Sequence, residues 1–512
     1  MRTADLLRVL VALVASLAFV GASVPLASAE PDEPTPDEPT PDEPSPDEPT
    51  PETPEEGDEE DESESDESGS GDTEPAEDEA SDEATEEDGV GNDEASEEEA
   101  DEPKDELLAI IGGNVHTVTG PTIPGGTVLI RNGRIDAIGR RVTIPDEAEV
   151  IDASGHEVYP GLIAVDSSGL LSRNPREGTD PYAIQLPFVL AAGITTAITS
   201  DNAGKVTSGT LDGILLRENL FIELEYLSTE PAKRREIRRG LGDARRYLRD
   251  LAAHEREKAL EKLGEDEESE LEPPDDEPVK GRNSRYKRLL EGDAIARFEA
   301  DEAGDLVAIA DLAEEFGLRV IIIGAEEGWT VADRLGRADI SVVVRPRAFN
   351  PGDDDRMRAN GATIENAGIL HRHGVPVAVI PADTWFTQGT QVGLWGLAGK
   401  DLKHLAYSAA FAVRGGLPSR AAIESLTITA ARTLGIDDRV GSLEVGKDAD
   451  VIITDGDLLH FMTHVRYAVV NGRVAYDKAE DTLFNHIRPD GDRASVGEAP
   501  ADHWPRRLGE PW

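Results

Sequence analysis

The stretch Val158-Tyr-Pro-Gly-Leu-Ile-Ala-Val-Asp-Ser-Ser168 is the part of this chain that says most about its fold. A short apolar segment follows a Pro-Gly turn and ends in polar side chains, as expected of a strand that runs into the mouth of a barrel. Residues two apart leave a strand on the same face, so Asp166 and Ser168 are expected to point the same way.

The sequence after this strand alternates between helical and strand patterns. A helix pattern, a glycine and a β-branched strand follow one another three times, at 187–200, 306–323 and 364–380. Such alternation predicts parallel strands joined by crossover helices, and its length predicts a (β/α)8 TIM-like barrel over residues 161–435.

Short strand patterns lie on both sides of the expected barrel. Residues 107–160 contain the hairpin turn Asn132-Gly133, and residues 436–480 contain Asp455-Gly456 and Asn471-Gly472. Each of the two β units is small, and the first reads as antiparallel. We therefore expect the two to combine into one composite β-sandwich domain.

Residues 1–29 have the pattern of a secretory signal peptide. Two arginines flank a short apolar run, and Ala27-Ser28-Ala29 suits cleavage after Ala29. This predicts export to the periplasm, the cell surface or the medium; an uncleaved membrane anchor is the alternative. No later apolar run is long enough to span a membrane, so no integral span is expected after cleavage.

Most of the negative charge lies in residues 30–106. This segment holds 39 Asp and Glu, and its first part repeats Pro-Asp-Glu-Pro-Thr, within a chain whose formal charge is −55. It has too few apolar residues to fold and is expected to be a disordered spacer. A weak cation-binding brush or a cell-surface stalk is the alternative. Nucleic acid is not expected as a partner, because its phosphates would be repelled.

Two further features limit the possible chemistry. The chain has no Cys, which excludes disulfides, thiolate ligands and a Cys nucleophile. Residues 228–292 interrupt the barrel rhythm with a charged helix pattern over 231–263, which we interpret as an outer decoration or a lid. Residues 481–512 form a tail, and the sequence leaves open whether the protein forms homo-oligomers.

Several local sequences, in their order, resemble the amidohydrolase superfamily, and most closely its imidazolonepropionase-like branch. The stretches that carry this resemblance are Gly125–Gly139, Val158–Ile163, Gly193–Thr196, Thr427–Ala431, Leu434–Ile453 and Val470–Arg473. The resemblance implies a barrel with a composite β-sandwich. It also implies one or two divalent metals at the barrel mouth, which activate a water whose proton an Asp after the last strand handles.

We compared the family's metal-ligand positions with this sequence. The His-x-His pair falls on Asp166 and Ser168, and a later His falls near Glu299. Another falls near Ile323-Gly324, whereas the Asp after the eighth strand matches Asp383. The resemblance therefore assigns Asp383 as the catalytic proton carrier and predicts that the usual metal-binding histidines are missing.

Two other sets of side chains are candidate metal ligands. His371 and His373 lie in an expected helix, where residues two apart diverge, so we interpret them as surface histidines. Asp166, Glu299 and Asp383 are expected at one mouth and predict an oxygen-rich site that suits Mg, Mn or Ca better than Zn. The alternative is that these carboxylates are solvated or hydrogen-bonded remnants and that no metal binds.

Two functions follow from these observations. The first is an exported hydrolase that cleaves a non-peptide C–N bond in a cyclic amide or similar small substrate. The second is a noncatalytic relative that keeps the fold as a binding or assembly module. A lesser third reading is metal-free hydrolysis by Asp383 with Glu299.

Overall fold

The structure is a computed structural model that describes residues 105–168, 170–183, 186–261, 272–346, 361–381, 392–393 and 400–480. The expected signal peptide, the acidic segment up to residue 104, the tail from residue 481 and Asp383 lie outside the described residues. Among the residues that are described, no helix combines the length and the apolar character needed to cross a membrane.

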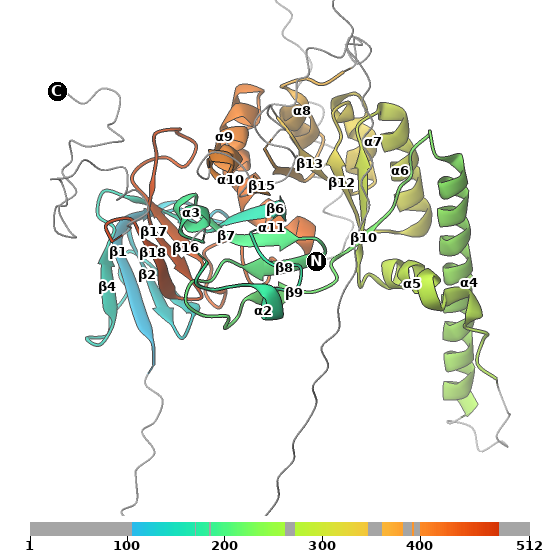
Figure 1. Ribbon diagram of the computed structural model, residues 1–512, viewed down its shortest axis with the longest axis horizontal. Coiled ribbons are helices and arrows are strands. Elements are labelled where there is room, and N and C mark those ends of the chain that lie inside the picture. The colour runs from blue at the N-terminus through green and yellow to red at the C-terminus, as the bar shows by residue number, and fades with distance from the viewer. Residues whose placement is uncertain are drawn as a thin grey trace, which may run out of the picture. The chain divides into compact units, whose positions relative to one another are not determined.

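Strands from the two ends of the chain form one eight-stranded sheet (Figure 1). The N-terminal strands are β1 (Leu107–Val115), β2 (Ile123–Arg131), β3 (Arg134–Gly139), β4 (Glu149–Asp152) and β5 (Glu157–Pro160). The C-terminal strands are β16 (Val451–Thr454), β17 (Val465–Val470) and β18 (Arg473–Asp477). Their order is β18-β17-β16-β5-β1-β2-β3, with β4 also paired to β1.

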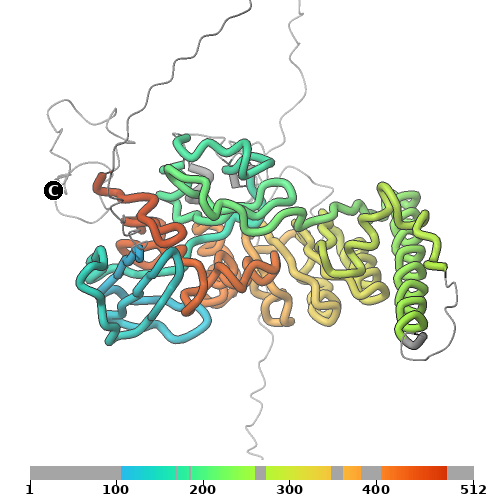
Figure 2. Tube along the Cα trace, turned by 90° about the horizontal axis from the view of Figure 1, so that it is seen from below, coloured from blue at the N-terminus to red at the C-terminus, as the bar shows by residue number. Residues whose placement is uncertain are grey.

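The two expected β units are joined directly by β5 and β16, which pair antiparallel with Tyr159 opposite Ile452. At the other edge, Arg134 of β3 forms an isolated bridge with Asp448, so the sheet curls around its own apolar core. The expectation of a sandwich therefore needs correction, because the hydrogen bonds make a single curled sheet. Both views show the blue N-terminal strands beside the red C-terminal ones (Figure 2).

Turn chemistry explains which hairpins form. Asn132 and Gly133 have φ of 50° and 79°, and Asn471 and Gly472 have 49° and 76°, which is the left-handed pair that a two-residue hairpin requires. These two predictions are confirmed. The hairpin predicted at Asp455-Gly456 is wrong, because residues 455–464 form a longer loop between β16 and β17.

The N-terminal unit is also not purely antiparallel. β4 and β5 both run parallel to β1, on the side opposite β2. The reason is the connection over residues 140–148, which returns the chain across the sheet before β4 begins.

A second sheet contains five parallel strands, in the order β10 (Phe221–Glu223), β11 (Ile295–Ala300), β12 (Val320–Gly324), β13 (Ser341–Val344) and β14 (Val377–Val379). A third sheet has the order β15 (Val392–Gly393), β6 (Leu162–Ser168), β7 (Ile194–Thr199), β8 (Asn202–Lys205) and β9 (Leu215–Arg217). β8 is antiparallel to both β7 and β9, where only parallel strands were expected. The two residues between β7 and β8 are too few for a crossover helix.

Helices surround the second and third sheets. They are α2 (Pro175–Gly178), α3 (Leu186–Ala191), α4 (Pro231–Glu261), α5 (Ser284–Glu291), α6 (Ala303–Phe316), α7 (Ala332–Arg337), α8 (Asn366–Arg372), α9 (Lys400–Arg414), α10 (Ser419–Leu426) and α11 (Ile428–Leu434). Short 3-10 turns lie at Glu277–Val279, Gly281–Asn283 and Gly328–Thr330. α6 ends at Gly317, whose φ of 69° caps the helix as the sequence predicted.

The second and third sheets share one apolar interior. Its members lie at alternating strand positions: Ile163 and Val165 of β6, Ile198 of β7, Phe221 of β10, Ile295 of β11, Ile321 and Ile323 of β12, Val343 of β13 and Ala378 of β14. The neighbouring strand residues face the other way, into a larger cluster with the surrounding helices. The fold is therefore α/β, with two sheets that face a common core.

The long helix α4 follows β10 and packs through one face. Ile237, Leu241 and Ala244 are buried in the larger apolar cluster, together with Tyr286 and Leu289 of α5. The spacing of these α4 residues is that of a single helical stripe. Both views show the yellow-green α4 beside α5 (Figure 2). The predicted helix is confirmed, and its first half is part of the folded core.

Candidate functional site

A layer of charged side chains lies directly above the shared apolar interior, where the parallel strands end. On β11, Ile295 belongs to the interior, and Arg297 and Glu299 follow it at intervals of two residues on the same face. Glu223 follows Phe221 on β10, and Arg345 follows Val343 of β13, by the same rule. Three strands of one sheet, β10, β11 and β13, thus place charges at one end of the core.

Asp166 joins this layer through a β-bulge. The pairing of β6 with β7 shifts between Ala164 and Ser167, so that β6 carries one extra residue there. Without the bulge, Asp166 would share a face with Ala164, which packs toward the helices. The extra residue turns Asp166 to the interior side, and bulges often re-aim side chains in this way near functional sites.

Arg297 links two carboxylates across the layer. Its Nη2 lies 3.3 Å from Asp166 Oδ2, and its Nη1 lies 3.5 Å from Glu223 Oε1. The side chains of Asp166 and Arg297 are 6% and 16% exposed, whereas that of Glu223 is 77% exposed. The buried contact is therefore the one between Arg297 and Asp166.

Arg345 makes a second pair in the same layer. Its Nη2 lies 3.2 Å from Glu299 Oε1, and its side chain is only 7% exposed. Its Nε is buried and has no hydrogen-bond partner within the described part of the chain. A guanidinium has no hydrogen-bond acceptor. The unused Nε–H of Arg345 can therefore donate a hydrogen bond to a bound ligand.

The pKa of Asp166 is raised above its ordinary value. Burial is the main cause, because it disfavours the charged carboxylate, and the nearby Glu299 adds to the effect. Arg297 and Arg345 oppose this rise through their positive charges. Asp166 is therefore a carboxyl group whose protonation depends on the two arginines.

An open cavity of about 640 Å³ lies beside this layer. Glu223, Arg297 and Glu299 line it from the strands, and helix α4 adds Lys233, Glu236 and Ile237. The remaining lining residues are Leu224, Glu225, Leu227, Arg282 and Arg285. Acidic and basic side chains are equal in number around this cavity, so its wall is close to neutral overall.

The structure brings together two of the three expected site residues. Asp166 and Glu299 lie in the same layer, while Asp383 lies outside the described residues. Among the residues described, no three His, Cys, Asp or Glu side chains gather closely enough to hold a metal ion. Each of the two carboxylates already contacts a guanidinium, so this described pair does not fit a divalent ion.

Sequence reasoning missed both arginines. The signal was present, because Arg297 stands two residues before Glu299 on a strand that begins with a core isoleucine. Arg345 likewise follows Val343 at an inward position. The contacts of Arg297 and Arg345 depend on which strands are neighbours in the sheet, and a local sequence pattern does not predict strand order.

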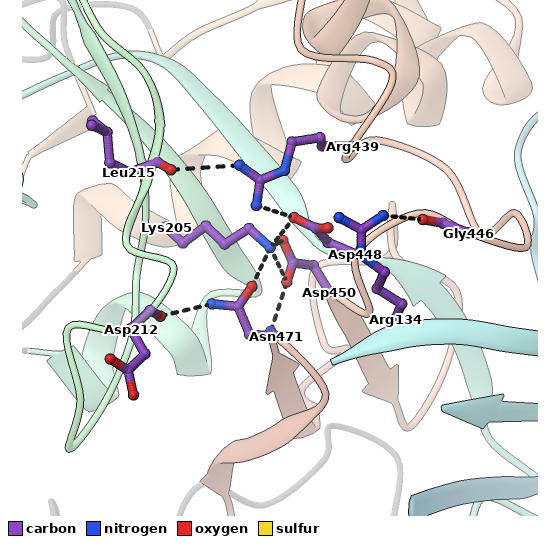
Figure 3. Close-up of polar contacts among 9 residues, drawn as sticks. All are labelled: Arg134, Lys205, Asp212, Leu215, Arg439, Gly446, Asp448, Asp450 and Asn471. Carbon is purple, nitrogen blue, oxygen red and sulfur yellow. Dashed lines mark hydrogen bonds and ion pairs between the residues drawn. The ribbon is translucent and has the colours of Figure 1, made fainter. Parts of the chain in front are cut away.

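A second buried charge cluster joins the third sheet to the eight-stranded sheet (Figure 3). Lys205 of β8 is fully buried, and its Nζ lies 2.8 Å from Asp448 Oδ2 and 3.1 Å from Asp450 Oδ1. It also donates to Asn471 Oδ1, while Arg439 Nη2 lies 2.7 Å from Asp448 Oδ2. The positive charges of Lys205 and Arg439 balance the two carboxylates, so these four side chains together carry no net charge.

This cluster acts as a structural joint. Burial alone would raise the pKa of Asp448, but Lys205 and Arg439 more than offset burial and hold it below its ordinary value. Lys205 lies at the opposite end of the third sheet from Asp166, because β8 runs antiparallel to β7. We therefore place the candidate functional site at the strand ends with Asp166.

Comparisons with known proteins agree with this architecture. The family model described as "Amidohydrolase family" matches residues 360–479. An imidazolonepropionase from Symbiobacterium thermophilum is 24% identical over 408 residues, which cover 70% of this chain and 92% of that protein. The crystal structure of an amidohydrolase from Thermotoga maritima superposes with a TM-score of 0.52 at 22% identity, covering 72% of this chain and 100% of that one.

These matches make the chain similar to the amidohydrolase superfamily. The expected likeness to imidazolonepropionase is confirmed as well. A protein named "Amidohydrolase tasK" from Hapsidospora irregularis is 32% identical over 98 residues, but the match covers 19% of this chain and only 10% of that protein. The likeness in fold fits the arrangement of strands that brings Asp166, Arg297 and Glu299 to one end of a common core.

Proposed function

We propose that this protein is an exported member of the amidohydrolase superfamily that binds a small, uncharged polar compound at the strand ends. The observation that carries this proposal is the balance of charge in the layer. Arg297 neutralises the buried Asp166, and Arg345 contacts Glu299, so a charged ligand would have to displace an existing pair. An amide group can instead use the unused donor of Arg345.

The proposed reaction is hydrolysis of a non-peptide C–N bond in a cyclic amide or similar substrate. Water adds to the amide carbonyl, the C–N bond breaks, and the departing nitrogen takes up a proton. Asp166 supports this reading because its raised pKa suits a group that exchanges protons. Asp383 remains the expected proton carrier from the superfamily resemblance.

We propose further that the metal site of this protein is degenerate. Arg297 and Arg345 place fixed positive charge beside the carboxylates at two positions where the resemblance implies metal ligands. A guanidinium beside each carboxylate repels another cation and engages one of the carboxylate oxygens. If an ion were bound together with Asp383, the oxygen ligands would suit Mg, Mn or Ca better than Zn.

We also propose that the second and third sheets close into one (β/α)8-type barrel. Their shared apolar interior supports it, since its members come from both sheets at inward positions. The superfamily likeness supports it too. In this barrel the antiparallel β8 takes the place of one parallel strand.

A noncatalytic binding protein is the second candidate. It is favoured by the same contact between Arg297 and Asp166, because the ion pair engages the carboxylate that would otherwise meet a substrate. In this reading the strand-end cavity still binds a ligand but does not turn it over.

Activity and metal content of the full chain test these proposals. The purified protein is assayed for ring opening of a panel of neutral cyclic amides, with divalent metals measured alongside. We expect turnover without bound metal that falls at least a hundredfold in Asp166→Asn and stays unchanged in Arg176→Gln, an exposed arginine of α2. Saturable binding without turnover would favour the binding protein, and activity that requires a stoichiometric metal would overturn the degenerate site.

A further inference from the structure

A second cavity, of about 630 Å³, lies at the opposite ends of the parallel strands from the candidate site. It is formed where β11 to β14 begin, with lining residues such as Ile295, Val320, Ser341 and Pro376. Helix α11 closes one side through Thr429, Arg432 and Thr433. The cavity shares no residue with the one beside Arg297.

Two arginines line this cavity without a carboxylate partner. Within the described residues, Arg319 and Arg432 make no ion pair and no hydrogen bond to an acidic side chain, although Asp339 lies at the same cavity. Other arginines on the described strands do contact carboxylates, as Arg131, Arg297 and Arg473 show. The side chains of Arg319 and Arg432 are both exposed, so within the described part of the chain the cavity presents unpaired positive charge, although the formal charge of the whole chain is −55.

A third arginine approaches the same place. A Cβ on Gly435, just after α11, would lie 2.8 Å from Arg217 Nη1 and 3.1 Å from Arg319 Nη2, so the two guanidinium groups are close neighbours. Arg217 donates to the backbone oxygens of Gly435 and Asp293, and neither acceptor carries a charge. Like charges at this spacing repel each other unless an anion lies between them.

Hydrogen-bond donors and acceptors complete the cavity wall. Thr433 is 6% exposed, and its hydroxyl has no partner within the described residues. Thr429, Ser341 and His371 line the same space. Guanidinium groups together with hydroxyls are the usual recognition set for phosphate oxygens.

We propose that this cavity binds a small molecule that carries a phosphate group. Arg319 and Arg432 hold the phosphate from two sides, and the hydroxyl of Thr433 donates to it. The volume of about 630 Å³ leaves room for more than a free phosphate ion. The site is separate from the proposed function, since it lies at the other end of the strands.

Calorimetric titration of the full chain with pyrophosphate at low salt tests the proposal. We expect saturable binding that weakens by about tenfold or more in Arg319→Gln and in Arg432→Gln. Arg176→Gln removes one exposed charge elsewhere and should leave the affinity unchanged. Far-ultraviolet circular dichroism of each variant shows whether it is folded as the wild type is.

Two results would overturn the site. One is the absence of binding to the wild type at millimolar pyrophosphate, and the other is equal affinity in the Arg319→Gln, Arg432→Gln and Arg176→Gln variants. Arg297→Met keeps the pyrophosphate site and alters the strand-end layer. If Arg297→Met still binds pyrophosphate but binds amides differently, the two sites are independent. The phosphate site can then fail or hold separately from the proposed function.

Discussion

Arg297 Nη2 lies 3.3 Å from Asp166 Oδ2, so a permanently charged guanidinium meets a buried carboxylate where two sheets face a common core. The two residues come from different sheets, one on β11 and one at the bulge of β6. Their contact opposes the rise in the pKa of Asp166 that burial causes.

Replacing Arg297 by methionine keeps much of the side-chain volume and removes the charge. We expect a loss of about 3 kcal/mol in the free energy of unfolding at neutral pH, because Asp166 is left buried without its partner. The pKa of Asp166 is already raised, so its contribution to stability is largest at low pH and is lost as pH rises through that pKa. Arg297→Met should therefore lower the free energy of unfolding less at pH 5 than at pH 8.

The control for this prediction is the double variant with Asp166→Asn. Without the carboxylate, Arg297→Met should cost far less and its pH dependence should disappear. Chemical denaturation at several pH values measures both effects. An equal cost at pH 5 and pH 8 would contradict the role given to Asp166.

Replacing Lys205 by methionine tests the joint between the sheets. Lys205 is fully buried beside Asp448 and Asp450, so its removal leaves buried negative charge and should cost about 3–5 kcal/mol. Asp450→Asn in the same background should recover part of this loss. Lys287→Met breaks only a half-exposed pair with Glu291 on α5 and should change stability by under about 0.5 kcal/mol.

Acid should weaken the same joint. The pKa of Asp448 is held below its ordinary value by Lys205 and Arg439 against the effect of burial. A lowered pKa gives stability that is present above the ordinary value, near ~4, and is lost as pH falls through the folded-state pKa. The free energy of unfolding should therefore fall less steeply below pH 4 in Asp448→Asn than in the wild type. Equal slopes in the two proteins would show that Asp448 does not contribute.

Two glycines of α4 should respond in opposite directions to alanine. A Cβ at Gly240 would lie 2.1 Å from Cε2 of Tyr286, a ring that is 1% exposed, so Gly240→Ala should cost about 1–3 kcal/mol. Gly242 has open space around the same position, so Gly242→Ala should stabilise the helix by about 0.5–1 kcal/mol. Thermal unfolding of both variants measures this difference. The same sign for both would mean that α4 does not pack on α5 as described.

Local chemistry in the sequence predicted much of the fold. The turns Asn132-Gly133 and Asn471-Gly472 require left-handed backbone, and Gly317 ends α6, so these features were readable without a structure. The antiparallel direction of β8 could not be predicted, because it depends on the tight turn after β7 and on the pairing of β8 with β7. The single curled sheet was missed because it depends on β5 meeting β16.

Only part of the candidate site could be predicted from the sequence. Asp166 and Glu299 lie near the ends of β6 and β11, where the sequence placed them, because an apolar run that ends in polar residues is a local feature. The bulge that turns Asp166 inward was not foreseen, and neither were the arginines that contact these carboxylates. Ion pairs between strands depend on register and on neighbouring strands, which a single sequence does not state.

The curled eight-stranded sheet has a consequence for the order in which the chain can fold. Thr454 of β16 pairs with Glu157 of β5, and these residues are 297 positions apart in the chain. During synthesis β1 to β5 must therefore wait, with an unpaired edge, until almost the whole described chain has been made. Pairing over such a separation is slow, and an open edge in the meantime invites association with other chains. Among the described strands, the last to be synthesised complete the sheet that the first ones begin.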